Sequence, residues 1–274
     1  MVACYRCAMF ASLALLSLAL SGSFHFGQVR FQPVDVLAYQ QEGKEPGKPI
    51  TVIALSDFKI DRAAVMEEID TPSALVAQVY KHEGGNFVMA RLSAPGHCGL
   101  AGFLGKTQQQ IDLGDSFPTK TTISASRVAG ECFTSTPGKM FDDSYDFRLT
   151  YDVPLTVIPK PSLLPTGGGE AGAALVALVK AIRAADWNGA RLHLREDEVP
   201  PTALKASQMR DYFHGLALNY PKTVTVTGGL VKGNRANVEI RGTDNDGKKI
   251  KGVFAMKKIG GQWRVLDRSL FFAE

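Results

Sequence analysis

A segment rich in proline and glycine lies near the middle of this 274-residue chain and predicts two separately folded parts. It reads VPLTVIPKPSLLPTGGG over residues 153–169. Proline fixes φ and removes an amide donor, and a run of glycines adds flexibility, so this stretch does not continue a helix or a central strand. We therefore place a linker at 159–169, between a domain at 50–158 and a domain at 170–274.

The composition and charge of the two parts differ. The chain is 45% hydrophobic and 21% charged, which is enough apolar material for packed cores and excludes intrinsic disorder. Residues 1–169 hold 14 Lys and Arg against 16 Asp and Glu, a net charge of −2, and residues 170–274 hold 17 against 11, a net charge of +6. The total of +4 is too balanced to indicate nucleic-acid binding by itself.

The N-terminus has the pattern of a secretory signal over residues 1–23. Arg6 supplies a positive charge, an apolar stretch follows from Met9 to Leu20, and small residues precede a cleavage point before Phe24. The pattern predicts an exported protein, periplasmic or secreted, with no integral membrane span in the mature chain. An uncleaved N-terminal anchor is the alternative. Residues 24–49 are predicted to be a flexible leader, because their last ten are polar and broken by Gly and Pro.

Two cysteines remain once the signal is removed, Cys98 and Cys132. An exported chain meets an oxidising compartment, so an even pair predicts a disulfide. Two unrelated buried thiols are the alternative interpretation.

The domain at 50–158 is predicted to be mostly β, as a sandwich or a barrel-like fold. Tyr145 to Val153 alternates apolar and polar side chains, which is typical of a half-buried strand. Further short strands are predicted at residues 50–60, 75–80, 87–92 and 120–127, with one helical stretch at 62–68.

The domain at 170–274 is predicted to be α+β. Leu175, Leu178, Val179 and Ile182 follow helical spacing, and a second helix with the same spacing covers 207–218. The period then changes to that of strands, and four antiparallel strands are predicted at residues 223–227, 236–241, 249–258 and 262–271. The overall fold class is therefore α+β, with a curved antiparallel sheet wrapping a long helix to form a cone.

The stretch from Ala173 to Phe272 resembles the nuclear-transport-factor-2-like superfamily, the cystatin-like cone. The matching features are the helix VKAIRAADW at 179–187, the sequence DYF at 211–213 and the final strand entered as GGQWRV at 260–265. The resemblance covers about 100 residues, and the order of elements carries most of it. That superfamily includes ketosteroid isomerase, polyketide cyclases and dehydratases, and non-catalytic binding modules, so the fold alone selects no activity.

An isomerase in this fold needs a carboxylate or histidine base inside the cone and a donor for the developing oxyanion. The candidates are Asp267, His214, Asp211 and Tyr212, of which Asp267 shares strand parity with Trp263. A rim histidine and a salt bridge from Asp267 to a nearby arginine are the competing interpretations. A ligand pocket in the cone would be lined by Trp187, Tyr212, Phe254, Met256, Trp263 and Asp267.

No spacing typical of a zinc site, phosphate loop or nucleophile elbow occurs in the body of the chain, so neither a metal nor a cofactor is predicted. Cations crowd the last two strands, which fits anionic components of the cell envelope, an acidic partner or a solubilising face. The sequence favours an exported two-domain binding protein of the cell envelope that binds a protein partner or a small apolar ligand. The alternative is an isomerase- or dehydratase-like enzyme. The oligomeric state is not predicted.

Overall fold

The computed structural model describes residues 19–43, 48–94, 96–105, 109–200 and 204–273. Within it the chain forms two compact units of mixed α and β structure. The first unit comprises Met1–Ile60 and Ala77–Val157, and the second comprises Asp61–Val76 and Ile158–Glu274. The segment Asp61–Val76 therefore belongs with the second unit, which corrects the assignment of residues 50–158 to a single domain.

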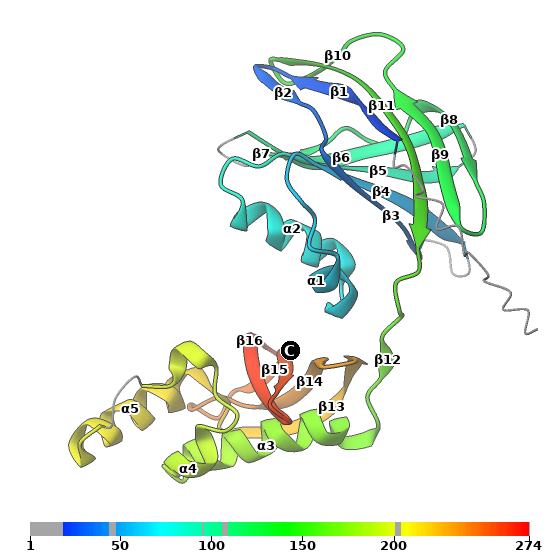
Figure 1. The fold of residues 1–274 in the computed structure, drawn as a ribbon. Coiled ribbons are helices and arrows are strands. Elements are labelled where there is room, and N and C mark those ends of the chain that lie inside the picture. Colours follow the sequence, from blue (N-terminus) through cyan, green and yellow to red (C-terminus); the bar gives the residue numbers. More distant parts are fainter. Residues whose placement is uncertain (1–18, 44–47, 95, 106–108, 201–203, 274) are drawn as a thin grey trace, which may run out of the picture. The chain divides into compact units, whose positions relative to one another are not determined.

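The first unit is a closed barrel of seven strands (Figure 1). The strands run in the order β11-β3-β4-β5-β6-β8-β9, and β9 pairs back with β11. Only the short β11–β3 contact is parallel among these pairings. The seven strands are β3 (Asp35–Glu42), β4 (Pro49–Ser56), β5 (Phe87–Ala94), β6 (His97–Leu104), β8 (Phe117–Ile123), β9 (Arg127–Phe133) and β11 (Asp143–Thr156).

The long strand β11 shows why the barrel forms. Its alternating apolar residues, Phe147, Leu149, Tyr151 and Val153, are all buried in the interior, whereas Arg148, Thr150 and Pro154 between them are exposed. Such alternation buries one face of a strand and leaves the other in water. Short strands β7 (Gln109–Asp112) and β10 (Gly138–Met140) extend the sheet on β6 and β11.

The residues predicted to be signal and leader contribute strands to this unit. β1 (Ala19–Phe26) pairs with β11, and β2 (Val29–Phe31) pairs with β1. Phe24, Phe26 and Phe31 are buried in the barrel core. This corrects the flexible leader over 24–49, since aromatic side chains at alternating positions can be buried in a sheet despite the polar segment that follows. Residues 19–23, assigned to the signal, also lie in β1, and residues 1–18 lie outside the described part.

The predicted strand at 75–80 is wrong, because those residues lie in helix α2 (Thr71–Lys81). The buried positions are Thr71, Ala74, Leu75, Gln78 and Val79, which is helical spacing rather than alternation. The Asp70 side chain accepts a hydrogen bond from the Ser73 backbone N–H at 3.1 Å and caps the first turn. Helix α1 (Arg62–Glu67), which precedes it, agrees with the predicted helical stretch.

The proline- and glycine-rich segment is partly ordered within the second unit. β12 (Ser162–Leu163) pairs with β13, and a short 3₁₀ turn covers Thr166–Gly168. Gly167, Gly168 and Gly169 all have positive φ, between 55° and 79°, which residues with a Cβ rarely adopt. The glycines therefore form the tight turn that starts the next helix, which corrects the interpretation of this segment as a flexible linker alone.

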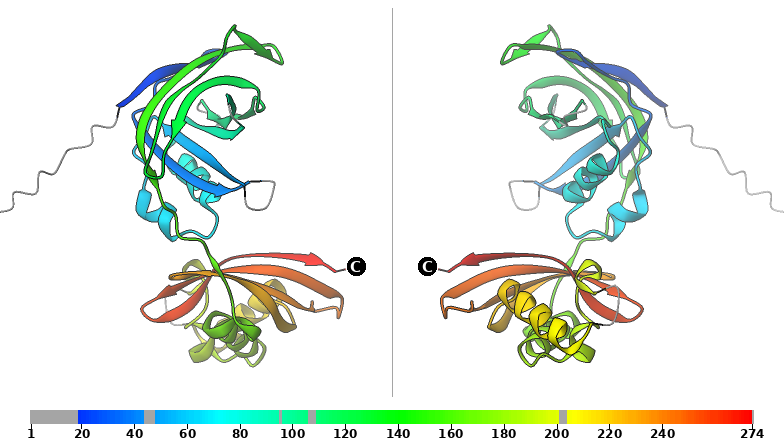
Figure 2. Two further views of the ribbon diagram at one scale, coloured as in Figure 1. Left: turned by 90° about the vertical axis from the view of Figure 1, so that its right-hand side faces the viewer. Right: turned by 90° about the vertical axis from the view of Figure 1, so that its left-hand side faces the viewer.

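The second unit contains a five-stranded antiparallel sheet, and the helices that follow residue 168 pack on one face of it (Figure 2). The strand order is β12-β13-β14-β15-β16, with β13 (Thr223–Lys232), β14 (Arg235–Thr243), β15 (Lys249–Ile259) and β16 (Gln262–Phe272). The helices are α3 (Gly169–Arg183), α4 (Trp187–Ala190) and α5 (Ala206–Asn219), with a 3₁₀ turn at Glu196–Glu198. The two predicted long helices and the four predicted strands are confirmed.

The core of this unit lies between the helices and the sheet. The predicted apolar face of α3 is buried there, with Leu175 and Leu178 inaccessible to water. On the sheet side the core is filled by Phe254, Met256 and Trp263. The face of the sheet with the even-numbered residues of β14 and β15 is therefore the inner face, and the odd-numbered residues form the outer face.

Candidate functional site

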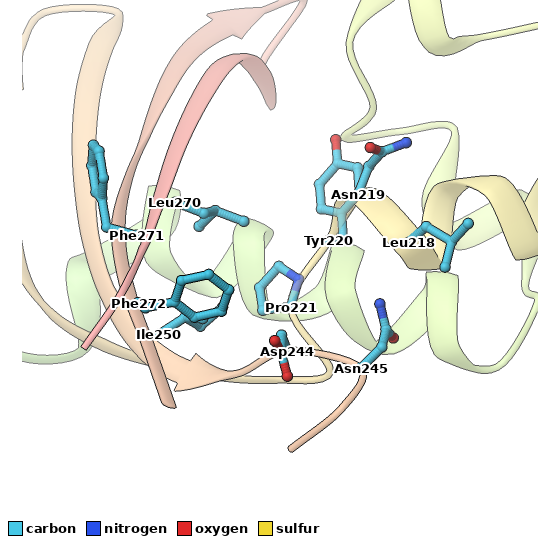
Figure 3. A pocket seen from close by; sticks show the side chains of 10 residues that line it. All are labelled: Leu218, Asn219, Tyr220, Pro221, Asp244, Asn245, Ile250, Leu270, Phe271 and Phe272. Atoms are coloured by element: carbon cyan, nitrogen blue, oxygen red, sulfur yellow. The ribbon is translucent and has the colours of Figure 1, made fainter. Parts of the chain in front are cut away.

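The inner face of the second unit opens at one end into a pocket of about 150 Å³ (Figure 3). On the sheet side it is lined by Ile250 and by residues 270–272, on the helix side by residues 218–221, and at the β14–β15 turn by Asp244 and Asn245. Leu218 and Phe272 are 64% and 68% exposed, so two large apolar side chains meet the solvent at the same pocket. The pocket therefore presents an apolar surface to solvent.

The end of α5 shapes the helix side of this pocket. Pro221 disfavours the helical conformation at the residue before it, and Tyr220 is accordingly extended, with φ −118° and ψ 149°. The chain leaves the helix there, and the Tyr220 ring stacks on Phe254 in the core, with ring centroids 6.0 Å apart. The Tyr–Pro pair thus ends the helix and provides one wall of the pocket.

Arg183 at the end of α3 holds the pocket rim together. Its guanidinium donates hydrogen bonds to the backbone carbonyls of Ala217 at 3.2 Å, Tyr220 at 2.6 Å and Pro221 at 3.3 Å. It also donates to Asn245 Oδ1 at 2.7 Å, in the β14–β15 turn. Arg183 therefore satisfies the free carbonyls at the end of α5 and joins that end to the sheet.

A β-bulge in β16 decides which side chains face the pocket. Met256 pairs with Val265, but Ala255 pairs with Asp267, so β16 contains one extra residue at Leu266. The extra residue reverses the faces beyond it. Arg268 consequently turns to the inner face, opposite Phe254, and Asp267 turns to the outer face.

Arg268 forms a largely buried cluster with Glu198 and two tyrosines. Its Nη1 lies 2.7 Å from Glu198 Oε1, and both side chains are only 16% exposed. The Tyr220 hydroxyl donates to Glu198 Oε2 at 2.8 Å, and the Tyr212 hydroxyl donates to the Glu198 backbone carbonyl. Both oxygens of the Glu198 carboxylate therefore have partners, as a buried charge requires.

This environment makes both tyrosines weaker acids. Burial, and then the negative charge of Glu198, raises the pKa of Tyr212 to about 12. The same two causes and the hydrogen bond to Glu198 raise the pKa of Tyr220 further. Neither phenol is therefore suited to exchange a proton near neutral pH.

The four predicted catalytic candidates are not brought together at a reactive site. Asp267 has a side chain 74% exposed and lies 3.8 Å from Arg195 Nη1, so a salt bridge forms, although to an arginine that the sequence did not suggest. Asp211 and His214 are exposed on α5. Tyr212 is half-buried and occupied by its hydrogen bond to Glu198.

The predicted pocket residues fall into two groups. Phe254, Met256 and Trp263 fill the core between sheet and helices, so they do not line an open cavity. Trp187 lies edge-on to Tyr212, with ring centroids 5.9 Å apart, at the edge of that core. The pocket lies instead at the end where α5 meets the last residues of β16.

Sequence reasoning missed Glu198, Tyr220 and Arg268 as partners. Glu198 lies in a charged stretch with no recognisable motif, and the single extra residue in β16 places Arg268 on the inner face against the parity of the strand. The Tyr–Pro pair at 220–221 could have indicated Tyr220, because the proline ends the helix and so places this aromatic side chain at the helix end.

The Sγ atoms of Cys98 and Cys132 lie at disulfide distance, their Cα atoms are 6.3 Å apart, and both side chains are fully buried in the barrel. Among the described residues, no three His, Cys, Asp or Glu side chains are grouped so as to hold a metal ion. In the same residues no helix is long and apolar enough to cross a membrane.

Comparison with known proteins identifies no relative: no family model, curated protein or solved structure gives a significant match to the chain.

Proposed function

We propose that the second unit is a recognition module that binds one apolar side chain of a protein partner in the pocket at the end of α5. The observation that carries this proposal is an open pocket of about 150 Å³ whose walls are mostly apolar, apart from Asn219, Asp244 and Asn245, and whose rim exposes Leu218 and Phe272. Exposed apolar surface around a concavity is typical of an interaction site.

The size of the pocket selects the kind of group it accepts. An engineered protein cavity of about 150 Å³ lined by Leu, Ile and Phe accepts benzene, whereas sites for drug-sized ligands span roughly 300–1,000 Å³. A pocket of this volume suits one phenyl ring or branched alkyl group. It is too small for the polycyclic substrates on which an isomerase or cyclase of the resembled superfamily would act.

The polar groups beside the pocket support binding rather than catalysis. Asp244 is the one carboxylate among the lining residues, and its Oδ1 accepts the Lys248 backbone N–H at 2.8 Å in the β14–β15 turn. Glu198, behind Tyr220, is paired with Arg268. A general base needs a free carboxylate or imidazole within reach of its substrate. Glu198 is occupied by Arg268, and Oδ1 of Asp244 is held in the turn.

The family and the location of the protein remain part of this proposal. The order of two long helices followed by an antiparallel sheet supports a nuclear-transport-factor-2-like fold. The buried Cys98–Cys132 pair supports export to an oxidising compartment, where disulfides persist. We accordingly propose an exported binding protein of the cell envelope.

A methyl-labelled NMR titration of the full chain tests the binding proposal. The probes are N-acetyl-phenylalanine amide and, for comparison, N-acetyl-alanine amide. We expect the phenylalanine probe to shift the methyl signals of Ile250, Leu270 and Leu218, and the alanine probe to leave them unchanged. Equal effects of the two probes, or shifts spread over both units, would refute a pocket for apolar side chains.

A pair of variants makes the test specific. Leu218→Glu places a charge at the rim and should weaken binding of the phenylalanine probe by about 5-fold, through lost apolar contact. Leu163→Glu changes a leucine that is 81% exposed on β12, outside the pocket lining, and should leave binding unchanged.

A further inference from the structure

The outer face of the sheet carries two rows of cations that cross neighbouring strands. In the first row Arg235 lies between Lys232 on β13 and Lys257 on β15. In the second row Arg241 on β14 lies directly opposite Lys251 on β15. Like charges placed opposite each other destabilise a sheet unless a counter-charge offsets them.

The first row has such a counter-charge within the second unit. Arg235 forms an ion pair with Glu68, and Lys257 Nζ lies 3.2 Å from Glu67 Oε2. Lys232 Nζ donates to the Glu68 backbone carbonyl at 2.6 Å. The acidic end of α1 therefore docks on this row by placing carboxylates against cross-strand cations.

The second row has no such partner among the residues that the structure describes. Arg241 and Lys251 are exposed and form no ion pair there. They lie in an open trough of about 280 Å³, whose other lining residues include Glu239, Val253 and Phe271. Phe271 stands opposite Lys251 in the ladder and is 59% exposed.

We propose that this trough binds an acidic side chain of a protein partner, with a neighbouring apolar side chain packed on Phe271. The partner's carboxylate would contact the second row in the same way that Glu67 and Glu68 contact the first row within the chain. Phe271 is the one lining residue that the trough shares with the α5 pocket, and Arg241 and Lys251 lie outside that pocket, so this proposal does not depend on the proposed function.

Charge and shape favour this occupant over other anions. Glu239 reduces the net charge of the trough to +1, which matches a single carboxylate better than the many charges of a nucleic acid or an anionic membrane. Val253 and Phe271 add apolar walls that a bare phosphate ion would leave unused. The trough is open along the sheet face, whereas small-molecule sites enclose most of their ligand, so a partner segment fits better.

The test is an NMR titration of the isotope-labelled full chain with two capped peptides. One peptide is N-acetyl-Ala-Phe-Glu-Ala-amide, and the other carries Gln in place of Glu. We expect the acidic peptide to shift the amide signals of residues 239–241, 251–253 and 271. Because an exposed ion pair is worth up to about 1 kcal/mol, the Gln peptide should bind about 5-fold more weakly.

Single-residue variants distinguish binding in the trough from non-specific attraction of the peptide to a basic surface. Arg241→Gln and Lys251→Gln should each weaken binding of the acidic peptide by about 5-fold, and raised salt should weaken that binding further. Lys222→Gln, which removes an exposed cation from outside the trough, should have no effect. Equal binding of the two peptides, an equal loss in Lys222→Gln, or concentration-dependent broadening of the trough signals without peptide would overturn the proposal. The last result would mean that a second copy of the chain covers this face.

Discussion

The guanidinium carbon of Arg268 lies 4.4 Å from the centre of the Tyr220 ring, on the inner face of the sheet. The contact exists because the bulge at Leu266 turns Arg268 inward. Arg268 also neutralises Glu198, which in turn accepts the Tyr220 hydroxyl. Arg268 therefore supports Tyr220, which forms one wall of the pocket. The first prediction concerns the removal of Arg268.

Arg268→Met should destabilise the second unit by about 2–4 kcal/mol, because it leaves the buried Glu198 carboxylate without its cation. Trp187 and Trp263 are the two tryptophans of the chain, and both lie in the second unit. Tryptophan fluorescence during urea unfolding therefore reports on this unit. Adding Glu198→Gln to Arg268→Met should recover part of the loss, and a double variant less stable than Arg268→Met alone would contradict this account.

The second unit should lose stability in alkali. The folded-state pKa values of Tyr212 and Tyr220 are raised above the usual value near 10. Their contribution is therefore fully present below about pH 10 and is lost as the pH rises toward the folded values, since the unfolded chain releases these protons first. Urea unfolding followed by tryptophan fluorescence between pH 8 and about pH 12 measures this loss.

Tyr220→Phe and Tyr212→Phe are the matched variants for the alkaline prediction. Each removes one titrating phenol while keeping the ring, so the decline of the unfolding free energy with pH should become less steep. A decline as steep in the double variant as in the parent chain would show that other groups cause it.

Loss of the Cys98–Cys132 link should destabilise the barrel. The cysteines are 34 residues apart in sequence, and the chain-entropy model gives about 4 kcal/mol for a loop of that length. The double variant Cys98→Ala with Cys132→Ala should therefore lower the urea midpoint of the barrel, measured by near-ultraviolet circular dichroism. Intact-mass measurement provides the control: if the parent protein is not two hydrogens lighter than its reduced form, no disulfide is present.

Gly22→Val should destabilise the barrel, because Gly22 packs tightly in β1. If β1 is part of the barrel, the mature chain must also contain it. Gly22 has a φ of +127°, and a Cβ there would lie 2.1 Å from the Arg148 carbonyl oxygen, so Val cannot be accommodated without displacing β1 or β11. We predict that the mature chain retains Gly22, with any cleavage before Ala19. Mass spectrometry of the purified protein checks this, and a mature N-terminus at Phe24 would contradict it.

The helices and strands could be predicted where one spacing of apolar residues continues over many positions. The alternation through Tyr145–Val153 gave β11, and the spacing of Leu175, Leu178 and Ile182 gave α3. Leu75–Tyr80 was misassigned because a short apolar run fits a strand as well as a buried helix face.

The candidate site could be predicted only in part, because a one-residue bulge in β16 changes which side chains face inward. Strand parity was sufficient to place Trp263 and Val265 on the inner face, but the bulge adds one residue and reverses the parity of Asp267 and Arg268. Glu198 reaches the site from a loop about 70 residues earlier, and the sequence pattern does not specify such tertiary pairing.

Intermolecular nuclear Overhauser contacts between N-acetyl-phenylalanine amide and the full chain test the central claim most directly. The claim is that the pocket at the end of α5 holds an apolar side chain. We predict contacts from the ring protons of the probe to the methyl groups of Ile250 and Leu270. Contacts to other methyl groups instead, or none at a probe concentration that saturates the shift changes, would contradict it.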